Sequence, residues 1–134
     1  MNSQTTKDIG YLILRLGLGG LVARHGWPML TGGAAKWEEL GTMASAVGIT
    51  FWPVVWGFVA AFAEVVGGIC VAIGFLFRPA CLLLTATMIG ALVFKLQDAS
   101  TFGYWIEYAE LATAFFAMLL MGPGRFSLSV SMNK

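Results

Sequence analysis

Residues 53–77 read PVVWGFVAAFAEVVGGICVAIGFLF, an apolar stretch whose single charge, Glu64, stands near the middle. A helix needs about 20 apolar residues to cross the roughly 30 Å hydrocarbon core of a bilayer, so this stretch can span it. A carboxylate at that depth costs at least about 2.5 kcal/mol, so we expect it to be paired, protonated or beside a polar cavity. Small residues recur on one side of this stretch: Gly57, Ala61, Gly68 and Ala72. They predict that a neighbouring helix approaches closely where Glu64 points.

The composition predicts an integral membrane protein of one domain, residues 1–134. Of its 134 residues, 58% are hydrophobic and 11% are charged, against roughly 25% charged residues in soluble domains. A chain this short has too little interior to hide so many apolar side chains from water. The net charge of +1 offers no basic surface, which excludes nucleic acid as a partner. With one histidine, and two cysteines in different predicted helices, we expect no metal site and no disulfide framework.

The hydropathy pattern predicts an all-α fold, a four-helix transmembrane bundle with a short amphipathic segment between its first two helices. The predicted helices cover about residues 7–28, 53–77, 79–96 and 104–121. Pro28 is expected to end the first helix, and Arg78-Pro79 to form a tight turn that makes the second and third helices antiparallel neighbours. Gly10, Gly17 and Gly20 form a small-residue edge on the first helix that is suited to close packing.

The segment 31–50 is expected to lie in the membrane interface. Trp37 and Leu40 share its apolar face, whereas Lys36 and Glu38 lie away from it, which is typical of a short amphipathic helix. Two interpretations remain open. The segment is either a connector anchored by tryptophans or a lid over the mouth of the bundle.

The positive charges at the helix ends predict the orientation of a multi-pass protein. Lys7, Arg78, Arg125 and Lys134 fall on one side, and Lys36 falls on the other. Because cytoplasmic segments carry the excess of lysine and arginine, we expect both termini to be cytoplasmic. The N-terminal apolar run carries Arg15 and exceeds the apolar core of a signal peptide, so we interpret it as a retained membrane helix.

Ionisable side chains inside the predicted spans are the candidate site residues. They are Arg15, Arg24, His25, Glu64, Lys95, Glu107 and Glu110. Helical rise places Arg15 within about 5 Å of Glu64 in depth, so we predict a buried Arg15–Glu64 ion pair. The other five form a predicted outer-half polar cluster, in which Lys95 and Arg24 neutralise Glu107 and Glu110. The buried pair is best explained by helix packing, whereas the cluster can bind a polar head group or pass a proton.

Several short motifs, in this order and spacing, resemble those of the DoxX family over nearly the whole chain. They are Arg15-Leu16, His25-Gly26, Ala63-Glu64 with Gly67-Gly68, Gly74 before Arg78, Glu110, and GPGRFSL at 122–128. The resemblance implies a four-helix bundle in a bacterial or archaeal cytoplasmic (inner) membrane. It also implies association with quinone-, thiosulfate- or thiol-linked oxidoreduction.

The resemblance also suggests which residues occupy the polar positions of the family pattern. His25, Glu64 and either Glu107 or Glu110 match them. Lys95 stands where the pattern usually has a histidine, which weakens any role that needs two histidines. Phe126 and Ser129 replace the tyrosine and aspartate common in the tail.

Three functional hypotheses follow, and the sequence leaves open whether the protein is an enzyme. In the first, a redox-associated membrane subunit binds a quinone head group near His25, Lys95 and Glu110, and a partner supplies electrons because the chain has no cofactor ligands of its own. The second is a non-catalytic accessory or assembly subunit of a membrane complex. The third is a small transporter or proton pathway centred on Glu64. Beyond the lipid bilayer, we expect the partner to be a second copy or a larger membrane oxidoreductase complex.

Overall fold

The computed structural model describes residues 2–98 and 104–132, and all regular structure within them is helical. The elements are α1 (Ser3–Leu30), α2 (Ala34–Gly41), the 3₁₀ helix η1 (Thr42–Val47), α3 (Pro53–Phe62), the π-helical turn η2 (Ala63–Gly67), α4 (Gly68–Ile73), α5 (Phe77–Gln97), α6 (Trp105–Met121) and α7 (Leu128–Met132). The all-α prediction is confirmed. Most of the predicted loop at 97–103, and Lys134, lie outside the described residues.

Within residues 2–98 and 104–132, two helices are long and apolar enough to cross a bilayer. One is the continuous helix Pro53–Ile73, formed by α3, η2 and α4, and the other is α5. Their side chains alternate between a buried face and an exposed apolar face that carries, for example, Phe58, Ile69 and Leu82. Such an exposed apolar surface is unfavourable in water and favourable against lipid.

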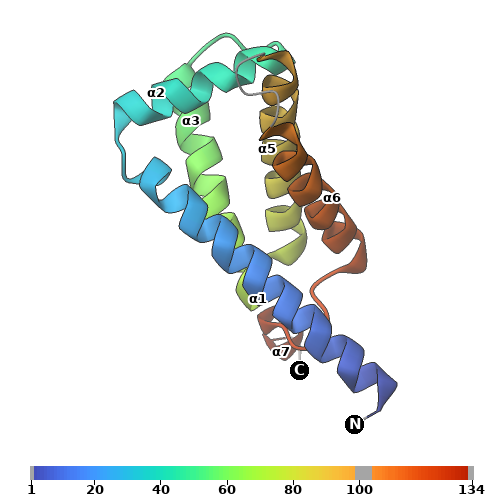
Figure 1. Ribbon diagram of the computed structural model, residues 1–134. Helices are drawn as coiled ribbons and strands as arrows, with labels where there is room; N and C mark the ends of the chain where they lie inside the picture. Colours follow the sequence, from blue (N-terminus) through green and yellow to red (C-terminus); the bar gives the residue numbers. More distant parts are fainter. Residues whose placement is uncertain (1, 99–103, 133–134) are drawn as a thin grey trace.

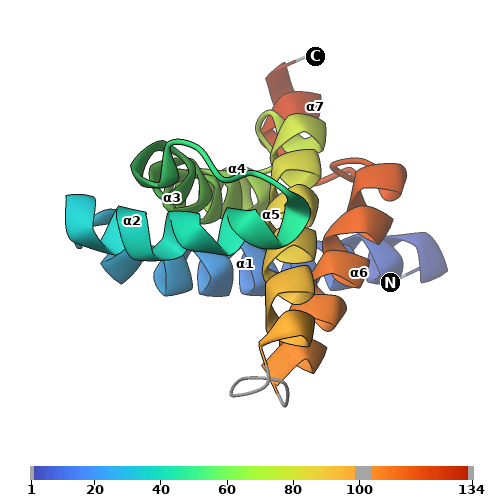
Figure 2. The same ribbon diagram turned by 90° about the horizontal axis from the view of Figure 1, so that it is seen from above.

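The helices are arranged as two sides joined at their ends (Figure 1). α1 and Pro53–Ile73 form one side, α5 and α6 form the other, and α2 with η1 lies across one end. Both termini lie at the opposite end. Seen from above, α2 and η1 extend from α3 to α5 and cover the space between the two sides (Figure 2). The core of the α5–α6 side contains Leu84, Met88, Phe115 and Met118.

The crossing of α1 and α4 depends on glycines that lie backbone to backbone. A Cβ on Gly19 would collide with the carbonyl of Gly68, and a Cβ on Gly68 would lie 2.5 Å from the carbonyl oxygen of Gly19. The predicted small-residue edge was therefore wrong for α1, since a Cβ on Gly10, Gly17 or Gly20 meets nothing within 4 Å. On the second predicted helix, by contrast, Ala61 and Gly68 are buried as expected.

Several boundaries differ from the sequence predictions. α1 begins at Ser3 behind an Asn2 cap and continues through Pro28 to Leu30. Pro28 cannot donate to the carbonyl of Arg24, yet the helix ends only two residues later. The second helix ends at Ile73, since Gly74 adopts φ +75°, the left-handed conformation that glycine favours. α5 starts at Phe77, so Arg78-Pro79 is the first turn of a helix, where proline is tolerated, and the predicted turn at Arg78-Pro79 was wrong.

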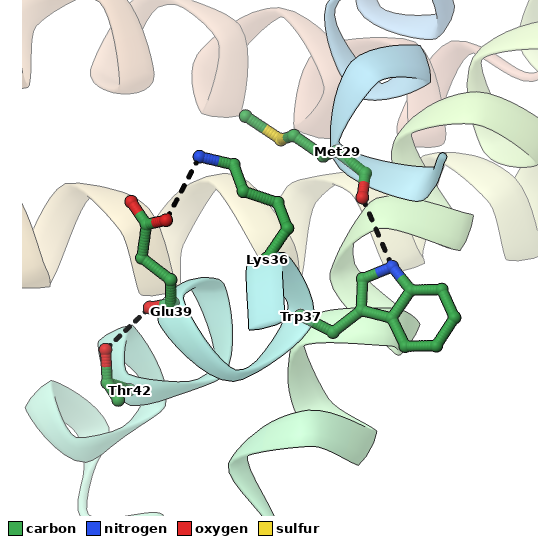
Figure 3. Close-up of polar contacts among 5 residues, drawn as sticks. All are labelled: Met29, Lys36, Trp37, Glu39 and Thr42. Carbon is green, nitrogen blue, oxygen red and sulfur yellow. Dashed lines mark hydrogen bonds and ion pairs between the residues drawn. The ribbon is translucent and has the colours of Figure 1, made fainter. Parts of the chain in front are cut away.

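The amphipathic segment is helical, as predicted, and polar contacts fix its corner with α1 (Figure 3). The indole nitrogen of Trp37 donates to the carbonyl oxygen of Met29 at 3.2 Å. Lys36 Nζ lies 3.3 Å from Glu39 Oε2, and the Thr42 hydroxyl donates to the carbonyl of Glu39 at 2.6 Å. The Trp37 bond ties the last turn of α1 to α2, and the other two contacts stabilise α2 and its junction with η1.

Two further glycines bring α2 against α3. A Cβ on Gly41 would overlap the backbone of Pro53, and a Cβ on Gly57 would overlap the backbone of Trp37. The ring of Trp37 also packs edge-on against Phe58, with ring centroids 5.0 Å apart. The segment is therefore packed tightly on α3 along its first half.

Candidate functional site

Glu64 is buried and pairs with His25. Its Oε2 lies 2.9 Å from His25 Nδ1, and this contact links the middle of Pro53–Ile73 to the C-terminal part of α1. The contact needs the glycine that follows the histidine, because a Cβ on Gly26 would lie 2.6 Å from the Cβ of Glu64. The His25-Gly26 motif thus supplies both the partner of the carboxylate and the space for its side chain.

The π-helical turn at Ala63–Gly67 contains Glu64. A π turn adds a residue to a helical turn and changes the direction of the side chains after it, and such turns occur often at functional sites. Gly67 ends this turn and Gly68 follows it, and their lack of side chains lets α5 and α1 pack on either side. The sequence showed the two glycines but gave no sign of the π turn itself.

The carboxylate holds the imidazole in one orientation. With Nδ1–H directed at Glu64, the neutral ring has Nε2 as an acceptor, and the protonated ring has Nε2–H as a donor. The His25 side chain is 54% exposed, whereas that of Glu64 is 8% exposed. The pair therefore presents one ring nitrogen that can exchange a proton or a hydrogen bond with a ligand.

His25 and Glu64 line a cavity of about 530 Å³ between the two sides of the molecule. This volume lies within the range of about 300–1,000 Å³ typical of small-molecule sites. The walls are mainly apolar; the residues with polar side-chain atoms are His25, Trp56, Glu64, Thr87 and Tyr108. An apolar pocket with a few polar groups is the usual form of a site that binds a small amphipathic molecule.

Trp56 and Tyr108 are wall residues that the sequence analysis did not select. Trp56, Ala60 and Glu64 repeat every four residues and all line the cavity, so helical periodicity could have identified Trp56. The indole nitrogen of Trp56 is buried and has no acceptor among the described residues. Tyr108 lies on α6 beside Glu107, and only the arrangement of the helices brings it to the cavity.

The predicted Arg15–Glu64 ion pair was wrong. Both side chains are buried, but Arg15 points to the end of the molecule that holds both termini and donates to four backbone carbonyls. Its acceptors are Val71 at 3.2 Å, Ala72 at 2.9 Å, and Pro123 and Phe126 at 2.7 Å each. The prediction rested on depth alone. In the structure, the α1–α4 crossing, where Gly19 meets Gly68, lies between Arg15 and Glu64 and separates them.

The remaining members of the predicted polar cluster do not form it. Glu107 is exposed on α6. Arg24 and Glu110 are exposed and Lys95 is half-buried, and within residues 2–98 and 104–132 none of the three has an ion pair. The predicted pairing of Lys95 and Arg24 with Glu107 and Glu110 was therefore wrong. Of the five cluster residues, only His25 lines the cavity.

Comparison with known families shows which family the chain belongs to. The DoxX family model matches residues 10–97, a range that includes Arg15, His25 and Glu64 and ends before α6. No curated protein and no solved structure matches the chain. Because the match covers more than half of the chain and includes both long apolar helices, the chain belongs to the DoxX family and is a membrane protein of the general DoxX type.

Proposed function

We propose that the chain is a multi-pass subunit of a bacterial inner membrane in which α1, Pro53–Ile73, α5 and α6 each cross the bilayer. The exposed apolar side chains of α1 and α6, such as Leu21 and Leu120, support this arrangement. A bundle of four spans buries the polar backbone of every crossing segment in helical hydrogen bonds, as a bilayer requires.

The distribution of basic residues supports a cytoplasmic location for both termini. The termini lie at one end of the molecule (Figure 1). Arg78 lies near Gly122 at this end, and Arg125 lies 3.8 Å from Asp8 there. Lys36 belongs to α2 at the opposite end. In this orientation α2 and η1 form the outer cover of the cavity, which favours the lid interpretation of segment 31–50.

The cavity, in this proposal, binds the head group of a quinone. The observation that carries the proposal is the Glu64–His25 pair at the wall of an otherwise apolar cavity. A quinone ring can pack against the apolar walls, while one carbonyl oxygen accepts a hydrogen bond from His25 Nε2–H. The hydroxyl of the reduced form can donate to the same nitrogen when the imidazole is neutral.

The redox role of the chain is therefore to hold the electron carrier rather than to oxidise a substrate. Electron transfer needs a redox cofactor, which a partner oxidoreductase supplies in this proposal. The quinone provides the two-electron chemistry when bound. The chain contributes orientation through His25 and Glu64, and it excludes water through the α2–η1 cover.

Quinone binding in lipid nanodiscs tests the proposal. We expect His25→Ala to weaken binding of a short-chain benzoquinone about tenfold or more, because a hydrogen bond to a charged group contributes roughly 1.5–3 kcal/mol. Arg24→Ala is the matched control, since Arg24 neighbours His25 but does not line the cavity. Equal binding to wild type and His25→Ala would refute the proposed site.

Exposed charges on the outer face favour assembly with another chain as a second role. Glu110 and Arg24 are exposed on α6 and α1, and a charge that faces lipid is costly, by about 2.5–3.5 kcal/mol at the bilayer centre and by less toward the interface. A second copy or a partner subunit that covers these positions would remove that cost. Native mass spectrometry should then show that Glu110→Gln shifts the assembly toward the single chain, and an unchanged distribution would count against this role.

A further inference from the structure

Protein closes the cavity at the η1 end and at the η2–α4 end, but not along the side between α3 and α5. α5 packs on η1 at one end and on η2 and α4 toward the other, whereas it makes little contact with α3 between them. Figure 1 shows α3 and α5 well apart next to α2 and η1 and closer together toward α4. Wall residues on both helices remain open to the surroundings: Val59 is 37% exposed, Leu83 38% and Ile89 46%.

The side opening faces lipid rather than water. α3 and α5 belong to the two helices that are long and apolar enough to span a bilayer, so the medium between them at this level is acyl chain. The aqueous end, by contrast, is covered by apolar side chains of α2 and η1, including Leu40, Met43 and Val47. A water-soluble ligand would have to displace this cover, whereas a lipid-soluble ligand can enter from the side.

We propose that the ligand of the cavity enters from the bilayer through the α3–α5 opening and leaves a long apolar chain in that opening. This inference rests on the proposed function and narrows the ligand to an isoprenoid quinone with its chain attached. The head group lies at His25 and Glu64, and the chain passes Val59 and Ile89 to the lipid. The opening is therefore part of the binding site, because it determines which quinones the protein accepts.

A substitution at Gly90 tests the opening without disturbing the fold. It lines the cavity on α5, and a Cβ at this position meets nothing within 4 Å. Gly90→Phe would place a ring in the passage without displacing backbone. Gly20→Phe is the matched control, because Gly20 on α1 also has open space around it and does not line the cavity.

The experiment measures binding of two probes in nanodiscs, dimethoxy-methyl-benzoquinone with and without a decyl chain, each expressed as mole fraction in the lipid. We expect Gly90→Phe to weaken binding of the decyl probe about tenfold, the effect of losing roughly 1.4 kcal/mol. Binding of the chainless probe should change less than about threefold. Gly20→Phe should leave both unchanged.

Other results separate the two proposals. If both probes bind in a His25-dependent way and Gly90→Phe affects neither, the side entrance is overturned and the quinone site stands. If neither probe binds wild type, both proposals are overturned. A decyl probe with a photoreactive chain end gives a second measurement on the unmodified protein: cross-links to α3 or α5 support the entrance, and cross-links confined to α2 and η1 overturn it.

Discussion

Replacing Arg15 should release the C-terminal segment from the rest of the molecule. Arg15 donates to the carbonyls of Val71 and Ala72 in the last turn of α4, and to those of Pro123 and Phe126 after α6. Carbonyls in the last turn of a helix have no intrahelical donor, so the guanidinium satisfies groups that the fold would otherwise leave unpaired. The side chain is only 1% exposed, and water cannot readily take its place.

The magnitude follows from these four bonds. An unsatisfied buried carbonyl costs about 1–3 kcal/mol, so leaving two of the four without donors costs about 2–6 kcal/mol. Arg15→Met also removes a buried charge that has no carboxylate partner in the described chain, which offsets part of the loss. We expect a net decrease of about 2–4 kcal/mol in the free energy of unfolding, and a smaller decrease for Arg15→Lys, which keeps the charge but loses the planar fork.

Reversible unfolding in mixed detergent, followed by circular dichroism, measures the effect. Arg125→Met is the control, because Arg125 is exposed and its carboxylate partner lies 3.8 Å away; its loss should change stability by less than about 0.5 kcal/mol. Limited proteolysis should also cut faster after Phe126 in Arg15→Met. An Arg15→Met protein within about 0.5 kcal/mol of wild type would refute the inference that this side chain anchors the tail.

Three further predictions concern the helix contacts and the site. Gly19→Ala should destabilise the protein by about 1–3 kcal/mol because its Cβ meets the backbone of α4, whereas Gly20→Ala should be neutral or stabilising by up to about 1 kcal/mol; equal thermal midpoints for the two variants would contradict this crossing. Trp37→Phe should cost about 1 kcal/mol in the same unfolding assay, since the bond to the end of α1 is lost. Glu64→Gln should keep the unfolding free energy within about 1 kcal/mol yet weaken quinone binding about fivefold, because the carboxylate no longer strengthens the hydrogen bond that orients His25; unchanged binding would show that the charge is not needed.

The sequence predicted the all-α class and the two long apolar helices because helix length and hydropathy can be read directly from the residues. The apolar run at 53–77 and the next one correspond to the two long apolar helices, and the pattern of Trp37 and Leu40 correctly predicted a short helix. Boundaries were less predictable, because they depend on single backbone conformations. Gly74 ended the second helix early, and a glycine in an apolar run gives no sign of whether it will bend the chain or pack against a neighbour.

The sequence could not predict which charged side chains of the site pair with one another. Helical rise gives the depth of a residue only relative to the ends of its own helix, and packing sets the point where two helices cross. Gly19 rather than Gly17 or Gly20 faces α4, and this choice of face carries His25 toward Glu64 and Arg15 toward the tail. Arg15, Gly19 and Gly26 all lie on the buried face of α1. Arg15 is ten residues, about 15 Å, from His25 along the helix, so it meets Val71 and Ala72 rather than Glu64.

The corrected pairing changes what Glu64 can do. An arginine beside Glu64 would have kept the carboxylate in a permanent ion pair, since an arginine does not lose its proton in proteins. A histidine gains and loses a proton near neutral pH, so the pair at the cavity can change its charge while the helices stay in place. Arg15, satisfied by the dipoles of four carbonyls, carries the structural role that the predicted pair had assigned to both residues. The separation leaves Glu64 and His25 available for a ligand that exchanges protons, which is the property that a quinone site requires.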